Sequence, residues 1–234
     1  MPRTRLFDPF GDFDTAGYLQ NAKGYKTASA VKRFEHSMHA AALPAAIAAL
    51  QKRKRLAYKD ILDTHRRLFG EVYPTWAGKD RLTTLPDRNI HKGSVTFAPP
   101  TDIFRAADYA LKEGGDPSAM RDHPGEIMGY LAYAHPFLEG NGRTILVVHG
   151  ELARRAEISI DWRAMPHRDY LAALTRELAH PNQGLLDAVM QPFVVPNPDQ
   201  LVLAHHQPII QPPPSGARTI SSRDPVVRGK PDDS

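Results

Sequence analysis

The 234-residue chain contains no cysteine, which excludes disulfide bonds and metal sites built on thiolates. It has no apolar run near the roughly 20 residues that a membrane-spanning helix needs. Its first residues, MPRTRLFDPFGDF, lack the apolar core of a secretory signal peptide. Neither sign of charge dominates, and a net charge of +4 over this length is too small for a nucleic-acid footprint. We therefore expect a cytoplasmic protein without a membrane or nucleic-acid partner.

The composition that is present fits one domain with an extension at each end. Hydrophobic residues make up 41% of the chain, and the length is sufficient for one domain with a core. We predict an N-terminal arm at residues 1–26 and a domain at residues 27–191. Residues 192–234 are rich in proline, with Ser, Arg and Asp between. Such a segment cannot bury enough apolar surface to offset the cost of ordering, so we predict a mostly disordered tail.

Most of the predicted domain has the apolar periodicity of amphipathic helices. The clearest helix runs from Tyr58 to Phe69, and His65 on its apolar face is expected to be a packed, hydrogen-bonded core residue. The helical stretch from residue 27 to about residue 55 contains Pro44, which favours two helices over one. Further helices are predicted at residues 101–112, 124–134, 142–156 and 166–178. Residues 82–100 lack a helical period and predict a hairpin, so the expected fold is a mainly α-helical bundle with one short β-hairpin.

The stretch from His135 to Arg143 carries the chemistry. His135 can act as a general base, because the unperturbed pKa of histidine lies near neutrality. Glu139 offers the kind of oxygen ligand that Mg²⁺ prefers when the ion also holds substrate phosphates. Arg143 offers a planar fork of donors that matches phosphate geometry.

Between these side chains, Gly140-Asn141-Gly142 forms a turn that opens an apolar run, which we interpret as a helix. Glycines let successive backbone N–H groups point at one spot, and a helix N-terminus adds positive partial charge. We therefore predict a phosphate site there, with the Asn141 side chain as a further donor. A hydroxyl that attacks a nucleotide phosphate in this site is the reaction that these residues favour.

The nine residues His-Pro-Phe-Leu-Glu-Gly-Asn-Gly-Arg at 135–143 resemble the signature of the Fic (filamentation induced by cAMP) family, which reads His-Pro-Phe-x-Asp/Glu-Gly-Asn-Gly-Arg-x-x-Arg. Residues 72–81 also resemble the Fic-core segment around Tyr-Pro-Trp-Ala-Gly, with Thr75 as an extra residue. The resemblance implies a Fic fold and a protein adenylyltransferase that uses ATP and Mg²⁺. Such an enzyme attaches AMP to a Tyr, Ser or Thr hydroxyl of a target protein and releases pyrophosphate.

The resemblance also implies how partners bind. The hairpin at residues 82–100 corresponds to a flap beside the active site, whose edge pairs with an extended segment of the target. Arg88 and Lys92 are candidates for gripping the target or the nucleotide, although ordinary solubilising charges explain each of them equally well. A Fic domain of this size implies either a bacterial toxin with a separate small antitoxin or an effector secreted into a host cell.

The chain departs from the family pattern at Leu146, where the signature has a second arginine that contacts the γ-phosphate of ATP. The same arginine pairs in Fic enzymes with a glutamate of an inhibitory Ser/Thr-x-x-x-Glu-Gly/Asn motif, which this sequence lacks. Two alternatives therefore stay open. One is a Fic-fold transferase that transfers UMP, phosphate or phosphocholine, and the other is a non-catalytic nucleotide-binding module with the tail as a docking segment.

Overall fold

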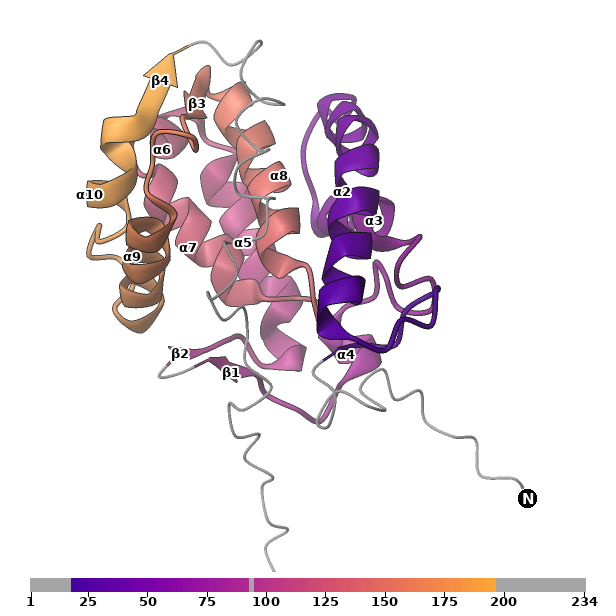
Figure 1. Cartoon of the computed structure of the whole chain (residues 1–234). Helices are drawn as coiled ribbons and strands as arrows, with labels where there is room; N and C mark the ends of the chain where they lie inside the picture. Colours follow the sequence, from indigo (N-terminus) through magenta and orange to yellow (C-terminus); the bar gives the residue numbers. More distant parts are fainter. Residues whose placement is uncertain (1–17, 93–94, 197–234) are drawn as a thin grey trace, which may run out of the picture.

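The computed structural model describes residues 18–92 and 95–196, and this part of the chain is mainly α-helical (Figure 1). Two small antiparallel sheets accompany the helices, one made of β1 (His91–Lys92) with β2 (Val95–Thr96) and one made of β3 (Ile158–Ile160) with β4 (Val194–Pro196). The predicted fold class, a helical bundle with a short hairpin, is confirmed. The helices are α2 (Ala28–Gln51), α3 (Tyr58–Phe69), α4 (Arg81–Thr84), α5 (Ile103–Gly114), α6 (Pro117–Asp122), α7 (Pro124–Ala134), α8 (Asn141–Arg155), α9 (His167–Ala179) and α10 (Asp187–Met190).

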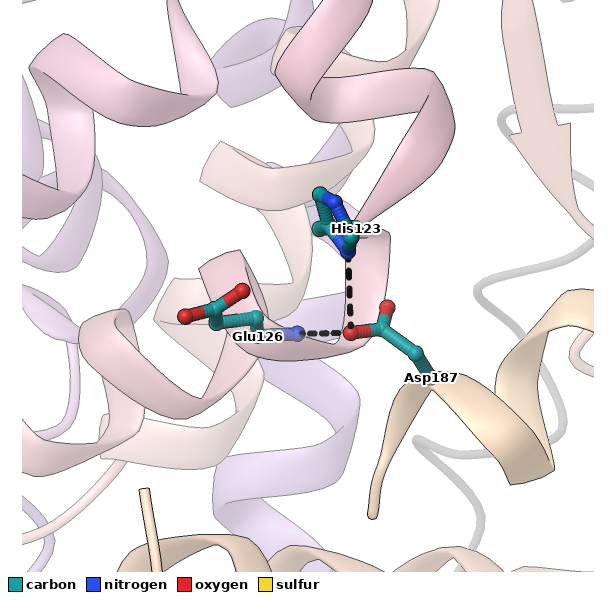
Figure 2. Close-up of side chains that lie close together, drawn as sticks. All are labelled: His123, Glu126 and Asp187. Atoms are coloured by element: carbon teal, nitrogen blue, oxygen red, sulfur yellow. Dashed lines mark hydrogen bonds and ion pairs between the residues drawn. The ribbon is translucent and has the colours of Figure 1, made fainter. Parts of the chain in front are cut away.

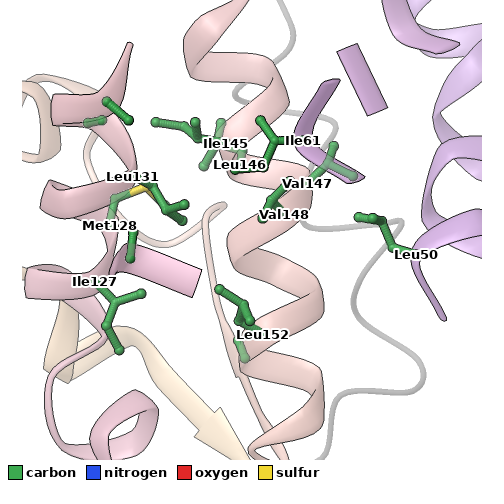
Figure 3. Packing of buried hydrophobic residues seen from close by; sticks show 14 of the residues in the cluster. Leu50, Ile61, Ile127, Met128, Leu131, Ile145, Leu146, Val147, Val148 and Leu152 are labelled. Atoms are coloured by element: carbon green, nitrogen blue, oxygen red, sulfur yellow. The ribbon is translucent and has the colours of Figure 1, made fainter. Parts of the chain in front are cut away.

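Helix α8 is the centre of the core, because apolar side chains surround it on most sides. Figure 1 shows α8 between α2 with α3 on one side and α7 with α9 on the other. Figure 3 shows the contact from close by, with Ile145 and Leu152 of α8 among residues of the facing helices. The first turns of α8, which begin at the predicted motif, are thereby fixed in the most densely packed part of the fold. No helix of the described residues is both long and apolar enough to cross a bilayer.

Helix α2 is continuous through Pro44, so the prediction of two helices there is wrong. A proline removes one backbone hydrogen bond to the carbonyl four residues earlier. Pro44 and Ala40 are both exposed, so water can satisfy that carbonyl. The neighbouring buried residues Leu43 and Ile47 pack in the core and hold the helix on both sides of the proline.

The segment predicted as a hairpin, residues 82–100, begins with the helical turn α4 instead. The Asp80 carboxylate accepts a hydrogen bond from the Thr83 amide at 3.1 Å and so caps this turn. The hairpin itself is confined to β1 and β2, where His91 pairs with Thr96 and Lys92 with Val95. The short strands have few apolar residues, which explains why their limits were not visible in the sequence.

The domain extends beyond residue 191 in the described part of the chain. Residues 158–160 form β3 and pair with β4 at residues 194–196. The predicted tail therefore starts inside the folded region, and residues 197–234 lie outside the described residues. At the other end, Leu19 is buried in the core and the Ala22 amide donates to the Val72 carbonyl at 2.9 Å, so the described part of the arm packs on the domain.

Candidate active site

His135 follows the last residue of α7, as predicted, and adopts a left-handed backbone conformation with φ 40° and ψ 56°. This region is uncommon for a residue with a side chain. The imidazole is half-buried and stacks on the Phe97 ring, with 3.8 Å between ring centroids. The His135 carbonyl accepts a hydrogen bond from Arg81 Nε at 2.7 Å.

Arg81 is fully buried and holds three backbone carbonyls around His135. Its amide donates to the Pro136 carbonyl at 2.7 Å, and its Nη2 donates to the Ala98 carbonyl at 2.6 Å, in addition to the bond from Nε to His135. Burial lowers the pKa of the guanidinium to about 10, so it stays charged at neutral pH. The sequence analysis did not single out this arginine.

The Phe137-to-Asn141 loop is closed by its own side chains. The Phe137 amide donates to Asn141 Oδ1 at 2.8 Å, and Asn141 Nδ2 donates to the Phe137 carbonyl at 2.7 Å. The structure thus places the predicted phosphate donor Asn141 in a buried position where its amide shapes the loop. Phe137 is fully buried, so its apolar ring anchors the loop in the core.

His65 packs beneath this loop and fixes it from α3. Its ring stacks on Phe137 with 3.7 Å between centroids. The Gly78 amide donates to His65 Nδ1 at 2.9 Å, so the proton resides on Nε2, which donates to the Glu139 carbonyl at 3.0 Å. Burial lowers the pKa of His65 to about 3, which agrees with a neutral ring. The predicted core histidine is confirmed, and it also contacts the motif directly.

Glycine is present at positions 140 and 142 of the turn for different structural reasons. Gly140 has φ 79°, and a β-carbon there would lie 2.5 Å from the Phe69 ring. Gly142 lies in the first turn of α8, is exposed, and has open space where a β-carbon would be. No side chain of the described residues caps α8, so its first amides are available to an anion.

Glu139 and Arg143 form a cluster with a carboxylate that the sequence analysis missed. Arg143 Nη2 donates to Glu35 Oε2 at 2.8 Å and to Glu139 Oε1 at 3.3 Å, and the guanidinium lies over the Phe69 ring. Glu35 comes from α2, is buried, and also accepts a hydrogen bond from the Tyr73 hydroxyl. Its position in a stripe of buried residues four apart was the available signal; the stripe consists of Val31, Glu35, His39 and Leu43.

The Glu139 carboxylate is suited to serve as one ligand of a Mg²⁺ ion. Its side chain is 31% exposed, Oε1 accepts from the Gly140 amide at 2.9 Å, and no hydrogen bond engages Oε2 in the described part of the chain. Mg²⁺ commonly takes one or two carboxylates together with substrate phosphates and water. Burial, followed by the negative charge of Glu35, raises the pKa of Glu139. A cation at Oε2 would favour the ionised form, so protons and metal compete for this carboxylate.

The flap candidates lie near the same end of α7. The Ala98 amide, just after β2, donates to the Tyr133 carbonyl at 3.0 Å, so the base of the hairpin is attached to the last turn of α7. Arg88 precedes the hairpin and is partly buried, and Lys92 is in β1.

A second group of ionisable residues, His123, Glu126 and Asp187, lies at the opposite end of α7 (Figure 2). Asp187 accepts hydrogen bonds from the Gly125 amide at 2.6 Å and the Glu126 amide at 3.3 Å. Its carboxylate therefore caps the N-terminus of α7, where the partial positive charge of the helix favours anions and disfavours a metal cation. We interpret this group as a cap that fastens α10 to α7.

A known protein family matches the part of the chain that contains the candidate site. The Fic/DOC family model matches residues 55–153, which include α3, the Arg81 turn, the hairpin and the whole motif. Protein adenylyltransferase VbhT of Bartonella schoenbuchensis is 32% identical over 193 residues, which cover 79% of this chain and 38% of VbhT. The probable protein adenylyltransferase y4lH of Sinorhizobium fredii is 32% identical over 128 residues, which cover 49% of this chain and 62% of y4lH.

Solved structures show the same fold. BepC of Bartonella tribocorum, with bound AMPPNP, has a TM-score of 0.64 and 16% identity, over 78% of this chain and 95% of that one. The N-terminal Fic domain of a Bep effector from Bartonella quintana, with bound ADP, also has a TM-score of 0.64, with 18% identity over 81% of this chain and 95% of that one. Residues 55–153 therefore match the Fic/DOC family model, and the described part of the chain has the fold of these Fic domains. It spans less than two thirds of the length of VbhT and of y4lH.

Proposed function

We propose that the chain is a protein adenylyltransferase, which transfers AMP from ATP to a Tyr, Ser or Thr hydroxyl of a target protein. The observation that carries this proposal is the placement of a half-buried histidine, His135, at the end of α7, a few residues before the uncapped N-terminus of α8. A base and an anion site in one loop are what nucleotidyl transfer to a hydroxyl requires. The names of VbhT and y4lH and the nucleotides bound to the two Bartonella structures support it.

In the proposed reaction, His135 takes the proton of the target hydroxyl while the hydroxyl oxygen attacks the α-phosphorus of ATP. The new P–O bond forms as the bond between the α-phosphorus and the bridging oxygen breaks, and pyrophosphate leaves. Amides of the first turn of α8 hold phosphate oxygens, and Arg143 adds positive charge beside them. Glu139 would hold Mg²⁺, which neutralises charge that develops on the leaving pyrophosphate.

The test is labelling of a cell lysate with ATP carrying a labelled α-phosphate, in the presence of Mg²⁺. We expect an adenylyl group on a target protein with the wild-type chain and none with His135→Ala. The matched control is His167→Ala, because His167 is an exposed histidine at the start of α9 and outside the site. Equal labelling by the His135→Ala variant would refute the proposal.

One observation favours a second candidate, a Fic transferase with another donor. Leu146, at the position of the second arginine of the signature, is 4% exposed and belongs to the apolar core (Figure 3). The chain therefore presents no guanidinium at that position to contact a γ-phosphate. Incubation of the lysate with labelled ATP, UTP or CDP-choline, each supplied alone, separates the candidates, because only the true donor will leave its label on the target. Binding of ATP without turnover in any lysate would indicate a non-catalytic module.

For partners, we propose that the target pairs with the β1–β2 hairpin, because the hairpin base is attached to the last turn of α7, just before His135. Arg88 and Lys92 remain candidates for contacts to the target. A small antitoxin protein is proposed as a second partner, with the chain as a bacterial toxin that acts in the cytoplasm. Delivery into a host cell is the competing setting, since the Bartonella relatives are described as translocated effectors.

A further inference from the structure

His135 has a backbone conformation that its own sequence does not favour. A φ of 40° places it in the left-handed region, which residues with a β-carbon rarely adopt. Such conformations persist where surrounding contacts determine them. Two consecutive carbonyls at this point of the chain, those of His135 and Pro136, both accept hydrogen bonds from Arg81.

Arg81 also connects His135 to the segment that carries Phe97, the residue on which the His135 ring stacks. Its Nη2 bonds the Ala98 carbonyl at 2.6 Å, and Ala98 follows Phe97, whose ring stacks on His135. The Ala98 amide in turn donates to the Tyr133 carbonyl in the last turn of α7. One guanidinium therefore ties together the main chain of His135 and the residue next to its stacking partner.

Burying the Arg81 guanidinium lowers the stability of the fold, so stability does not explain why an arginine is present at this position. Arg81 is fully buried, forms no ion pair within the described residues, and keeps Nη1 without a hydrogen-bond partner. Besides the carbonyls, the nearby Asp80 carboxylate stabilises the charge through space. A buried charge without a direct ion-pair partner is still expensive, and apolar residues of similar volume often replace buried ion pairs without loss of stability. The arginine is therefore better explained by the geometry that its hydrogen bonds impose on the main chain at His135 and Ala98.

We propose that Arg81 is a positioning residue that holds His135 in the orientation needed to accept a proton from the target hydroxyl. This inference rests on the proposed transferase function. Arg81 does not touch the reacting atoms and acts through the carbonyls of His135 and Ala98. Replacing it should lower the rate of the chemical step and leave nucleotide binding unchanged, because the amides of α8 do not depend on it.

The experiment compares Arg81→Lys and Arg81→Met with a matched control, Arg155→Met. Arg155 also uses its guanidinium to bind backbone carbonyls, those of Leu50, Arg53 and Lys54, but it lies at the far end of α8. The main-chain bond from residue 81 to Pro136 survives every substitution, so the variants isolate the side chain. Three measurements are made on each protein: kcat and KM for ATP, the melting temperature, and hydrogen exchange in a peptide spanning residues 134–141.

We expect Arg81→Met to lower kcat by about 100-fold at unchanged KM, as misplacement of a catalytic group by about 1 Å does. Arg81→Lys keeps the charge and N–H donors but loses the planar fork of the guanidinium, so it should recover part of that loss. Exchange at residues 134–141 should quicken in Arg81→Met and stay at the wild-type rate in Arg155→Met, even where both melt at the same temperature.

Two results would overturn the inference. One is equal kcat loss in Arg81→Met and Arg155→Met variants of equal melting temperature, and the other is wild-type exchange at residues 134–141 in Arg81→Met. A wild-type chain that transfers nothing would refute the proposed function instead. Exchange would then still report whether Arg81 holds the loop, because it does not require turnover.

Discussion

At the scale of single residues, the most informative contact joins Glu35 to Arg143. The carboxylate and the guanidinium are 7% and 13% exposed, so neither charge is compensated by water to the extent of a surface pair. Removing one partner of such a pair leaves the other buried and unpaired. Glu139 and Tyr73 complete the cluster, but only Glu35 attaches it to α2.

We therefore predict that Glu35→Ala lowers the free energy of unfolding by about 3–5 kcal/mol. Urea denaturation of the variant and the wild type measures the difference. Glu71→Ala is the control, because Glu71 is an exposed glutamate and its replacement should change stability little. A loss below about 1 kcal/mol for Glu35→Ala would show that the pair is no more than a surface ion pair in energetic terms.

The pH dependence of stability should report on His65. Its pKa is about 3 in the folded chain and about 6.5 when unfolded, so the unfolded state binds the extra proton between these values. The contribution is fully present above pH 6.5 and is lost as the pH falls toward 3. We predict that the stability difference between the wild type and His65→Gln declines by about 1.2 kcal/mol from pH 6 to pH 5, because the unfolded histidine is only partly protonated at pH 6.

Urea titrations of both proteins at intervals between pH 7.5 and pH 5 measure this slope. Taking the difference between the two proteins removes the contributions of the carboxylates and the other histidines, because these groups titrate alike in both. A difference that is independent of pH would mean that His65 can be protonated in the folded state.

The sequence was sufficient to identify the residues of the motif but not the side chains that hold it. His135, Glu139 and Arg143 follow one another along the chain, so their proximity is visible in the sequence. Glu35 and Arg81 reach the loop from distant positions, and their polarity alone does not distinguish them from surface residues. Asn141 was assigned a donor role, whereas its local position, four residues after Phe137, lets its amide close the loop.

At the scale of elements, the turn into α8 separates two kinds of glycine. Gly140→Ala should lower the free energy of unfolding by about 2 kcal/mol or more, because the left-handed backbone alone costs about 1–2 kcal/mol and the β-carbon meets Phe69. Gly142→Ala should leave stability unchanged or raise it by up to about 1 kcal/mol, since alanine is the better helix former.

Gly142→Ala should weaken nucleotide binding even though it leaves the fold intact. The space beside Gly142 is open, so a methyl group there occupies the approach of a phosphate to the α8 amides. Calorimetric titration of ATP with Mg²⁺ into Gly142→Ala should therefore show weaker binding in a fully folded protein. Unchanged affinity would place the phosphates away from this turn.

Helices with a clear apolar period or a long apolar run were predicted from the sequence, and elements fixed by tertiary contacts were not. Helices α3, α7 and α8 fall in the first class. Helix α2 runs through Pro44 because its buried residues continue on both sides, which local propensity does not record. β3 has three buried residues and forms a strand only because β4 lies beside it.

At the scale of the whole molecule, β4 brings the end of the described chain back to the end of α8. The pairing of residues 194–196 with residues 158–160 and the bond from the Asp161 amide to the Phe193 carbonyl fix this return. We predict that a chain ending after Gln191 melts at a lower temperature than a chain ending after Pro196. The partly buried Phe193 and the β3 hydrogen bonds are lost only in the shorter form. Equal melting temperatures would show that the β3–β4 pair contributes nothing to stability.

The side chains that shape the motif loop have a consequence for the newly made chain. The contacts of Glu139 with His65, His135 with Arg81, and Arg143 with Glu35 join residues that are 74, 54 and 108 positions apart. Contacts between distant residues form late in folding, because closing a long loop costs entropy before the contact repays it. A nascent or partly folded chain thus carries the nine-residue motif without its geometry. The geometry of the motif loop should therefore be among the last features of the fold to be completed.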